Sequence, residues 1–515
     1  MAHFIKIHPL DNVVIPVQDA PTGTEAAPGV MTVSDIPQGH KIALKNLLKG
    51  DEVIRYGVAV GRLLCDVPAG GHINEHILEM PLAPDLDMDN LPWARGRQWT
   101  AEFGSFPENL PGVFEGYETP GNFFAGTRNI LGIMTGVQCV AGPINVAVQK
   151  IKTELLPRYP NVDDVVALNH SYGCGVSIAA PDSEIPIRTL KNLIRNPNFG
   201  GEIMLVALGC EKLTVDMLLS ENENNPENVI VLQHLPGFRA MMDTIYDMAE
   251  KKLQKLNERK RVTLPLKKLC IGLQCGGSDS FSGITANPAV GYACDLLICA
   301  GGTAMFSEVT EARDGVQFLA ARCATEELSH KLAQEMKWYD AYLERGGANT
   351  NANPTPGNKS GGLSNIMEKT MGAIAKSGSA PITGILGTGE RISQEPDSPK
   401  GLFFASTPSG DFVCGSLQLA SGITLQVFTT GRGTPYGLAQ APVIKVGSRT
   451  ELKSIWDDLI DVNAGTIAEG KETIQQVGER IFKMIVDTAS GHHKPFAEKY
   501  RFHNDICIFD PAPLT

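Results

Sequence analysis

The stretch Leu269-Cys-Ile-Gly-Leu-Gln-Cys275-Gly-Gly-Ser-Asp279 lies near the middle of the 515-residue chain. Its apolar first half predicts a buried strand, and its Gly-Gly pair predicts a turn directly after that strand. In open α/β sheets, ligands bind where the carboxyl ends of the strands give way to loops. Glycines at such a place let the backbone turn sharply or approach a ligand closely. The stretch therefore predicts an α/β fold with a functional site at a strand end.

A cysteine beside or near a glycine recurs along the chain, in most cases after a short apolar run that reads as a strand. The members of this set are Cys139, Cys174, Cys210, Cys275 and Cys414. A soft thiolate near His, Asp or Glu is a suitable metal ligand. Buried thiols that only fill the core would give the same pattern. Because the pattern recurs over much of the chain, we expect a composite active site and hence an enzyme.

The bulk composition indicates several domains and excludes some classes of partner. A chain of 515 residues exceeds what one hydrophobic core usually supports, so two to four domains are expected. The net charge of −12 argues against nucleic acid as a partner. No stretch approaches the ~20 apolar residues of a membrane span. The eleven cysteines form no CxxC pair and the N-terminus lacks a signal-peptide core, so we expect a cytoplasmic protein with reduced thiols.

The distribution of strands, helices and turns along the chain predicts a multi-domain α/β architecture. Residues 1–92 show short strands broken by turns, which indicates a small all-β domain. Residues 93–111 are rich in Pro, Gly and polar side chains and indicate a linker. Residues 112–262 and 263–515 alternate strands with helices, which predicts two α/β domains with largely parallel sheets. Within the last of these, Leu296–Cys299 is expected to be a strand.

Two segments of the sequence carry histidines in patterns that suit a functional site. Asn169 and His170 lie two residues before a Gly-Cys-Gly turn, a place where packing alone gives little reason for two polar residues. His72 and His76 alternate with Asn74 along an expected strand, which would put them on one face and suits a metal ion. Isolated surface histidines are the alternative interpretation of the second pattern.

Charged residues follow two further expected strands. Arg432 lies in Gly431-Arg-Gly-Thr434, where a guanidinium among free backbone amides suits a carboxylate, although a turn with a surface arginine is equally compatible. Glu308 and Glu311 are candidates for general acid or base residues. Their alternative interpretation is ordinary negative charge at the N-terminus of a helix.

Longer blocks of the sequence resemble the altronate/galactarate dehydratase family. They are Gly39–Leu44, Leu168–Val176, Pro197–Glu202, Leu208–Lys212, Gln274–Gly283, Thr285–Gly291 and Phe428–Gly437. The likeness covers nearly the whole chain, from about Phe4 to Thr515. The resemblance implies an N-terminal β-clip domain of the SAF type followed by two α/β domains. It also implies a homodimer.

The resemblance further implies a reaction and a metal. The reaction is elimination of water from galactarate, a sugar diacid, to give 5-dehydro-4-deoxyglucarate. The metal is Fe(II), with Mn(II) or Mg(II) as alternatives. Altronate dehydratases carry a His-x-His-x-His run where this chain has His72-Ile-Asn-Glu-His76, while galactarate dehydratases replace the histidines and keep the Glu. The other blocks favour galactarate.

Other functions stay open at this stage. One is a lyase acting on altronate or on another hydroxy acid, such as a sulfonated one. Another is a module that binds sugar acids without catalysis. An iron–sulfur cluster ligated by spaced cysteines also stays open.

Dehydration of a hydroxy acid requires a base for the proton next to the carboxylate and positive charge for the developing negative charge. The expected site draws on residues from all domains. The expected catalytic residues are His40, Lys41, Glu75, His170 and Asp279. The expected substrate-binding residues are Asn169, Ser278, Arg432 and Thr434. The expected metal ligands are His40, His72, His76, Cys174 and Glu211.

Overall fold

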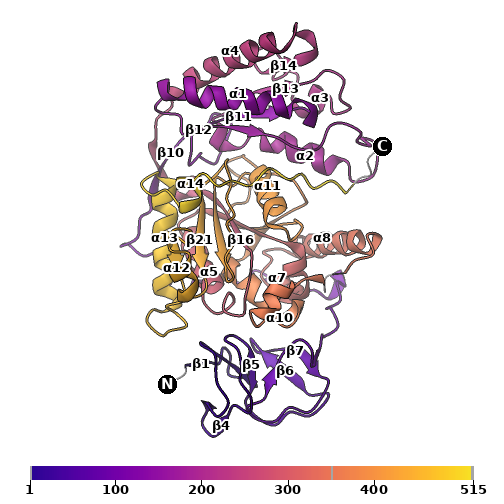
Figure 1. Ribbon diagram of the computed structural model, residues 1–515, viewed down its shortest axis with the longest axis vertical. Coiled ribbons are helices and arrows are strands. Elements are labelled where there is room, and N and C mark those ends of the chain that lie inside the picture. The colour runs from indigo at the N-terminus through magenta and orange to yellow at the C-terminus, as the bar shows by residue number, and fades with distance from the viewer. Residues whose placement is uncertain (1–2, 350–351, 512–515) are drawn as a thin grey trace.

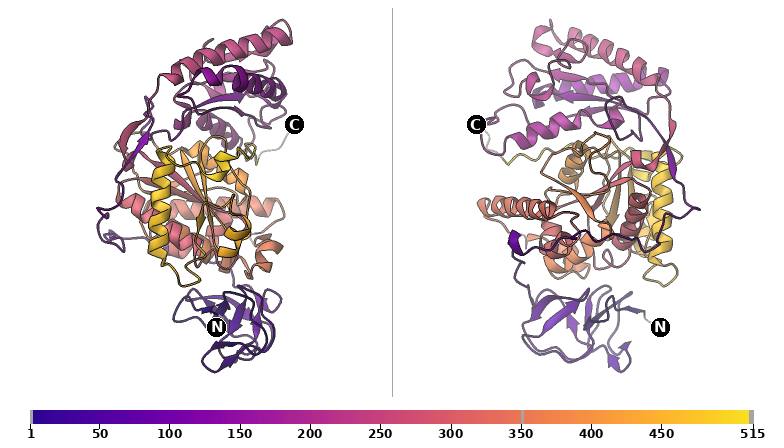
Figure 2. Two further views of the ribbon diagram at one scale, coloured as in Figure 1. Left: turned by 60° about the vertical axis from the view of Figure 1, so that its left-hand side comes forward. Right: turned by 180° about the vertical axis from the view of Figure 1, so that it is seen from behind.

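The computed structural model describes residues 3–349 and 352–511, and their elements form three domains in a row (Figure 1). The N-terminal domain lies at one end and the central domain lies at the other. The C-terminal domain separates them, as all three ribbon views agree (Figure 2). The domain that comes last in the sequence is therefore the one that contacts both others.

The N-terminal domain consists of short strands in small antiparallel sheets. One sheet has the order β1-β2-β5-β8 and another the order β6-β7-β9, with β3 and β4 forming a separate pair. The bounds are β1 (Phe4–Ile5), β2 (Val13–Pro16), β3 (Glu25–Ala27), β4 (Val30–Met31), β5 (Lys41–Ala43), β6 (Glu52–Arg55), β7 (Val58–Leu63), β8 (His72–Ile73) and β9 (Leu78–Glu79). The strands stay short because turns with glycines at positive φ, such as Gly39 and Gly70, interrupt them.

The central domain has one parallel sheet of four strands in the order β12-β11-β13-β14. Its strands are β11 (Ile130–Thr135), β12 (Asp164–Leu168), β13 (Leu205–Ala207) and β14 (Val229–Val231). Helices α1 (Ala141–Glu154) and α4 (Phe238–Asn257) share one apolar core with the sheet. Helix α2 (Glu184–Leu193) belongs to a second core that continues into the C-terminal domain, and α3 (Val215–Leu218) follows β13. Because both faces are covered, β11 is buried along its whole length.

The C-terminal domain has a parallel sheet of seven strands in the order β18-β19-β17-β16-β20-β21-β22. The bounds are β16 (Cys270–Cys275), β17 (Thr303–Ser307), β18 (Ile382–Leu386), β19 (Leu402–Ala405), β20 (Leu425–Thr430), β21 (Val443–Gly447) and β22 (Val462–Asn463). The first strand, β16, lies at the centre, and the chain adds strands on one side of it before it returns to the other. Such a reversal opens a crevice at the carboxyl ends of the strands, which is the usual ligand site of open α/β sheets.

Helices cover this sheet and its carboxyl edge. The longer ones are α5 (Ala286–Cys299), α8 (Glu326–Arg345), α10 (Ile366–Ile374), α11 (Asp411–Ser421) and α13 (Ile474–Ala489). The shorter ones are α6 (Val309–Ala312), α7 (Val316–Ala320), α9 (Pro356–Ser360), α12 (Thr450–Ile455) and α14 (Phe496–Lys499). No helix among the described residues is long and apolar enough to cross a membrane. The expected fold class, an all-β domain followed by α/β domains with parallel sheets, is confirmed.

Two local predictions are wrong. Leu296–Cys299 belongs to the end of helix α5 and is not a strand. The reason is that a short apolar run has the same pattern in a fully buried helix as in a buried strand. The strand expected through His72, Asn74 and His76 ends at Ile73, and a turn follows it.

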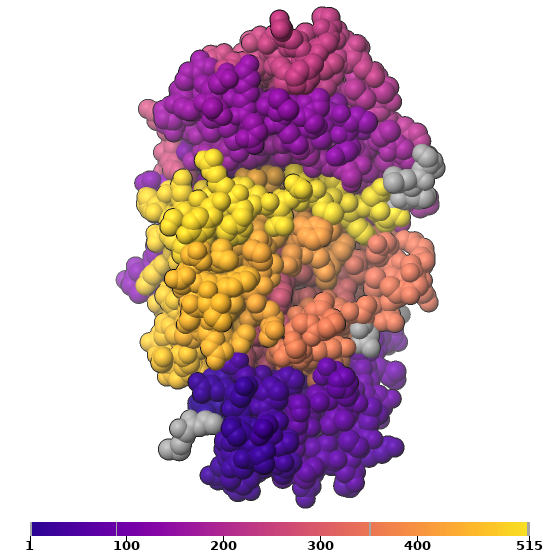
Figure 3. All heavy atoms as spheres, viewed as in Figure 1, coloured from indigo at the N-terminus to yellow at the C-terminus, as the bar shows by residue number. Residues whose placement is uncertain are grey.

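The segments between the domains contain few regular elements. From Leu91 to Gly112 no helix or strand is formed, and a two-stranded antiparallel ribbon then follows. This ribbon pairs β10 (Val113–Gly116) with β15 (Val262–Pro265), so it lies where the chain enters and leaves the central domain. The last described residues run as a band between the central and C-terminal domains (Figure 3). Arg128 of the central domain anchors this band through an ion pair with Glu498.

A buried group of charges joins the N-terminal domain to the C-terminal domain. Lys41 of β5 donates to both carboxylate oxygens of Glu368 in α10, at 2.9 and 3.1 Å, and Arg55 of β6 also pairs with Glu368. All three side chains are buried. Removing one partner of a buried ion pair leaves an uncompensated charge in a medium of low dielectric constant, which is costly. This contact therefore fixes where the N-terminal domain sits.

We expect the substitution Glu368→Gln to loosen the N-terminal domain, because it leaves Lys41 and Arg55 buried without a carboxylate. The expected cost is about 3–5 kcal/mol. Limited proteolysis between residues 82 and 111 should become faster, and thermal unfolding should begin at a lower temperature. The matched control is Glu52→Gln, which removes an exposed pair with Arg62 and should cost less than about 1 kcal/mol. Equal proteolysis rates in the wild type and Glu368→Gln would contradict this role.

Candidate active site at the carboxyl edge of the seven-stranded sheet

The carboxyl edge of the seven-stranded sheet faces the N-terminal domain. Ser280, in the loop after β16, donates its hydroxyl to the carbonyl of Gly39 at 2.7 Å. The carbonyl of Ser280 accepts a hydrogen bond from Arg55 at 2.9 Å. Side chains of both domains therefore meet at the crevice where the strand order reverses. Two groups of titratable side chains lie there, one under the sheet edge and one on the N-terminal domain.

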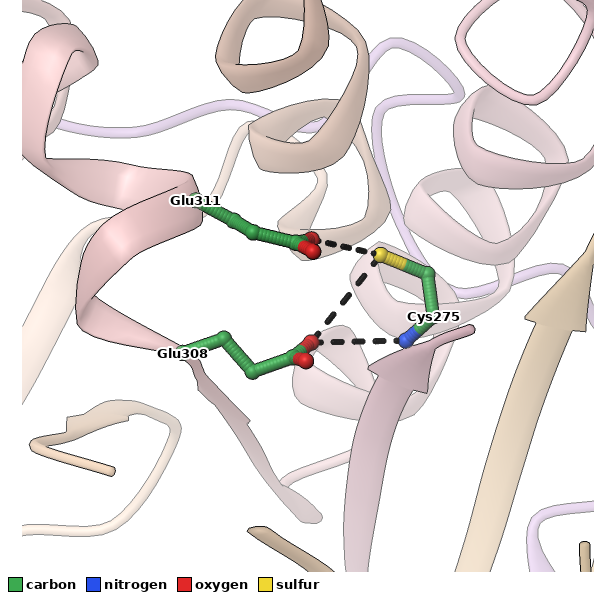
Figure 4. A group of neighbouring side chains, drawn as sticks. All are labelled: Cys275, Glu308 and Glu311. Carbon is green, nitrogen blue, oxygen red and sulfur yellow. Dashed lines mark hydrogen bonds between the residues drawn. The ribbon is translucent and has the colours of Figure 1, made fainter. Parts of the chain in front are cut away.

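The first group, which we call the Cys–Glu cluster, consists of Cys275, Glu308, Glu311, Lys369 and Lys376. Cys275 ends β16, and its thiol donates to Glu311 at 3.0 Å (Figure 4). The ammonium of Lys376 lies 3.1 Å from the sulfur of Cys275 and 3.4 Å from Glu308. Lys369 pairs with Glu311 at 2.7 Å. All five side chains are buried, so their charges act on one another without screening by water.

The two carboxyl groups of this cluster have pKa values displaced in opposite directions. Burial, and then the charge of Glu311, raises the pKa of Glu308 to about 8. Burial alone would also raise the pKa of Glu311, but Lys369 and Lys376 outweigh it and hold that pKa below its usual value. Burial raises the pKa of the Cys275 thiol. Near pH 7 the cluster thus holds a proton on Glu308 and a negative charge on Glu311.

The backbone at Glu308 is strained, since this buried residue follows β17 with φ of 78°. A side chain other than glycine rarely adopts this conformation, and such strain is concentrated at functional sites. It turns the Glu308 carboxylate back toward the backbone amide of Cys275, at 3.5 Å. The fold therefore keeps both Glu308 and Glu311 beside Cys275.

The Cys–Glu cluster has the donor atoms for a metal ion. Among residues 3–349 and 352–511, the one group of three His, Cys, Asp or Glu ligand atoms that lie within 4.8 Å of one another is Cys275, Glu308 and Glu311. A thiolate with two carboxylates suits a divalent transition metal. Binding would require Glu308 and Cys275 to lose their protons. With these protons lost, the three side chains offer one donor atom each to a single ion.

The second group is a histidine pair on the N-terminal domain. Nδ1 of His40 lies 3.0 Å from Nε2 of His72, and Nε2 of His40 lies 3.4 Å from the carbonyl of Ser360. Burial, and to a smaller extent the neighbouring His40 and Lys41, lowers the pKa of His72 to about 4. Burial, and then Lys41, also lowers the pKa of His40. Both rings are therefore neutral at pH 7, with one proton shared between them as a hydrogen bond.

Arg432 and Thr434 belong to a loop beside Gly277, and Arg432 also approaches the segment that contacts His40. Their loop contacts Gly277, whose carbonyl accepts from the backbone amide of Arg432 at 2.7 Å. If Gly361 carried a Cβ atom, that atom would lie 3.4 Å from Cδ of Arg432. Gly361 directly follows Ser360, whose carbonyl lies 3.4 Å from His40. The guanidinium of Arg432 is exposed and has no hydrogen-bond or ion-pair partner in the part of the chain that the structure describes. It is a free cation next to the segment that contacts His40.

Asp279 and Ser278 are engaged with the protein itself. Asp279 accepts from Ser282 and Ser448 and pairs with Arg449 at 2.9 Å. Ser278 is buried, and its carbonyl accepts from Asn358 at 2.7 Å. Arg449 in turn lines a cleft of about 300 Å³ between the N-terminal and C-terminal domains. Asp279 thus positions Arg449 and shapes the crevice.

The other predicted residues of the N-terminal domain are spread around the histidine pair. Lys41 lies behind it, enclosed by its ion pair with Glu368. Glu75 is partly buried, and its carboxylate lies 3.7 Å from Nε2 of His76. The His76 side chain is 80% exposed. His40 and His72 are brought together by the fold, whereas His76 points to the surface.

Four predicted residues lie in the central domain, on the far side of the C-terminal domain from the histidine pair (Figure 1). Asn169 donates to Asn145 at 2.7 Å. His170 is 2% exposed, and its Nε2 lies 2.6 Å from the carbonyl of Thr135. Cys174 is exposed, and Glu211 accepts from the backbone amides of Leu208 and Gly209. The expected single composite site is therefore divided between two sheet edges.

Comparison with known proteins assigns the family. The model of the altronate/galactarate dehydratase SAF domain matches residues 2–81. The model of the D-galactarate dehydratase/altronate hydrolase second domain matches residues 116–257, and that of the D-galactarate/altronate dehydratase C-terminal domain matches residues 266–514. The chain belongs to the D-galactarate/altronate dehydratase family. It is therefore an enzyme of the hydro-lyase class.

Individual relatives match over most of their length. Galactarate dehydratase (L-threo-forming) of Escherichia coli is 49% identical over 100% of this chain and 98% of its own. Altronate dehydratase of Bacillus subtilis is 34% identical over 95% of this chain and 96% of its own. The beta subunit of (2R)-sulfolactate sulfo-lyase from Chromohalobacter salexigens is 30% identical over 65% of this chain and 84% of its own. The recognition of the family from the sequence is confirmed.

Sequence reasoning did not assign Glu308, Glu311 and Cys275 to one metal-binding group. It named the two glutamates as acid or base candidates and the cysteine as a ligand or a packing residue. The available signal was that Cys275 and Glu308 each end an apolar run. Because neighbouring parallel strands end at the same edge, these two positions lie close together. The contribution of Lys369 and Lys376 from α10 and the following turn has no signal in the sequence.

We expect the stability of the central domain to depend on the protonation of His170. Burial lowers its pKa from 6.5 to about 4, so between these values the unfolded state binds a proton that the folded state does not. The free energy of unfolding should therefore fall as the pH falls from 6.5 to 4, by on the order of 3 kcal/mol from this residue. In His170→Gln, whose amide can still donate to Thr135, thermal unfolding should lose this part of its pH dependence. Identical pH profiles for the two proteins would contradict a buried neutral His170.

Proposed function

We propose that this enzyme dehydrates galactarate to 5-dehydro-4-deoxyglucarate at the crevice between the N-terminal and C-terminal domains. The observation that carries the proposal is the 49% identity, over the whole chain, with galactarate dehydratase of Escherichia coli. The free guanidinium and the neutral histidine pair at the strand ends supply the groups that such a reaction needs. The same crevice lies where ligands bind in open α/β sheets.

Arg432 is the proposed anchor for one carboxylate of the diacid. A guanidinium binds a carboxylate through two parallel hydrogen bonds, and Arg432 has no described protein partner that would compete. Thr434 and the backbone amides of the glycine turn at Gly277 lie beside it and can bind hydroxyl groups. A substrate held there extends toward His40, because Gly361 lies next to Arg432 and its neighbour Ser360 contacts His40.

The histidine pair is the proposed acid–base group. Being neutral at pH 7, it can accept the proton from the carbon next to the bound carboxylate. It accepts one proton and not two, since a second would place two cations 3.0 Å apart. The hydroxyl that leaves the next carbon needs one proton to depart as water. The pair supplies this proton by returning the one it has taken up, and the resulting enol becomes the keto product.

Cys275, Glu308 and Glu311 are the proposed ligands of the divalent ion, which is Fe(II) by the family resemblance, with Mn(II) or Mg(II) as alternatives. When bound, such an ion supplies a Lewis acid that stabilises negative charge on carboxylate oxygens. Lys369 and Lys376 pair with the two glutamates and balance their charge. The metal ligands expected from the sequence alone stay a prediction; they are His40, His72, His76, Cys174 and Glu211. Lys41 and Asp279 are assigned positioning roles, because their charged groups are engaged by Glu368 and Arg449.

Altronate is the second candidate substrate, because the chain keeps His72 and His76 and is 34% identical with an altronate dehydratase. A homodimer and a cytoplasmic location complete the proposal and rest on the family resemblance.

The proposal predicts turnover of galactarate. Purified protein should convert galactarate to a 2-keto product under anaerobic conditions with added Fe(II), and should convert glucarate and altronate much more slowly. A chelator should abolish the reaction, and added Fe(II) should restore it. Preference for altronate would overturn the substrate assignment. Binding of all three acids without product would overturn catalysis and favour a binding module.

Substitution of His40 tests the proposed base. His40→Gln can still form hydrogen bonds with His72 and Ser360 but cannot accept a proton at neutral pH. We expect kcat on galactarate to fall by about 10²–10⁴-fold, with KM changed far less. His492→Gln is the matched control, because the His492 side chain is 63% exposed beside Glu115 and has no part in the pair, and its kcat should stay within about twofold of the wild type. Equal activity of His40→Gln and the control would remove His40 from the mechanism.

A further inference from the structure

Three cysteines gather at the carboxyl edge of the central sheet. Cys139 follows β11, Cys174 follows β12 and Cys210 follows β13, and these strands are neighbours in the order β12-β11-β13. Neighbouring strands lie about 4.8 Å apart, so the ends of three of them span about 10 Å. Unlike the cysteines of the apolar cores, all three are exposed and none forms a disulfide. Exposure is unusual, because cysteine is among the residue types most often buried.

The loops that carry these cysteines contact one another directly. The carbonyl of Gly173 accepts from the backbone amides of Lys212 and Leu213, at 3.1 and 3.2 Å, which joins the Cys174 loop to the Cys210 loop. A Cβ on Gly173 would lie 2.6 Å from the carbonyl of Gly136, which joins the Cys174 loop to the segment that leads to Cys139. A Cβ on Gly136 would in turn lie 3.0 Å from the carboxylate of Glu211. The three loops thus form one continuous rim.

Polar groups support the rim from below. Glu211 accepts the amides of Leu208 and Gly209 at 2.9 and 2.6 Å, which fixes the turn before Cys210. Gln233, after β14, donates its amide to the sulfur of Cys210 at 3.2 Å. His170 contacts the Thr135 carbonyl and so ties the Cys174 loop to the end of β11. Hydrogen bonds to a thiolate of this kind stabilise and tune metal–sulfur centres.

We propose that Cys139, Cys174 and Cys210 ligate an iron–sulfur cluster. Cysteine thiolates are the usual ligands of such a cluster, in which each sulfur ligand of a cubane binds a different iron atom. The thiols therefore do not need the close mutual approach that a single ion requires. A 4Fe–4S cluster usually has four cysteine ligands, so three leave one iron open to a small ligand such as water or a carboxylate. The proposal concerns the central domain and does not depend on the galactarate assignment.

The test measures cluster content instead of turnover. The full-length protein is purified anaerobically and reconstituted with Fe(II) and sulfide, and its iron, acid-labile sulfide, visible absorption and Mössbauer spectrum are measured. We expect about four iron and four sulfide per chain, with the spectrum of a cubane cluster. Cys139→Ser, Cys174→Ser and Cys210→Ser should each lower the bound iron and sulfide by more than about tenfold.

Two controls keep the test specific. Cys65→Ser removes the other exposed cysteine, which belongs to the N-terminal domain, and should keep the full cluster content. Circular dichroism and gel filtration show whether each variant is folded. Iron without labile sulfide, a bound zinc ion in place of iron, or equal cluster content in the wild type and Cys174→Ser would each overturn the proposal. Loss of galactarate turnover with the cluster retained would affect only the proposed function.

Discussion

The contact between Glu368 and the two cations Lys41 and Arg55 determines how the active-site crevice is assembled. Burying three charges is favourable only when each is paired, so the N-terminal domain can dock in one orientation. That orientation places His40 and His72 over the ends of the strands of another domain. Helix α10 couples this docking to the chemistry, because Glu368 faces the N-terminal domain while its neighbour Lys369 pairs with Glu311 of the Cys–Glu cluster.

Charge in this crevice is divided between a buried and an exposed part. Beneath the sheet edge, two lysines pair with the glutamates, while burial and the charge of Glu311 raise the pKa of Glu308 to about 8 and so keep its proton in place. At the surface, the guanidinium of Arg432 lacks an intramolecular partner in the described chain and the histidine rings stay neutral. An anionic substrate thus meets positive charge that the protein has not already compensated. The net charge of −12 does not oppose this, because a small ligand responds to the local field of its pocket.

The sequence predicted those features that depend on local pattern. The apolar run before Cys275 and the glycines after it are sufficient to predict a buried strand and a turn at its carboxyl end. The pattern could not distinguish helix from strand at Leu296–Cys299, because a helix buried on all sides has no polar face. It also could not show that Lys41 and Asp279 are engaged, since their partners Glu368 and Arg449 lie far away in the chain. Pairings of that kind follow from tertiary structure alone.

The same limit explains why the recurring cysteines suggested one composite site. Each cysteine motif marks the end of a strand or the start of a helix, and a chain with two parallel sheets has two carboxyl edges. Cys275 belongs to the edge that faces the N-terminal domain, whereas Cys139, Cys174 and Cys210 belong to the edge of the central sheet. A single site would require both edges to face each other, but the C-terminal domain keeps the histidine pair and the central sheet apart (Figure 1). The exposed thiols of the central domain therefore need an explanation of their own, and a cluster bound within one chain accounts for their gathering on three adjacent strands.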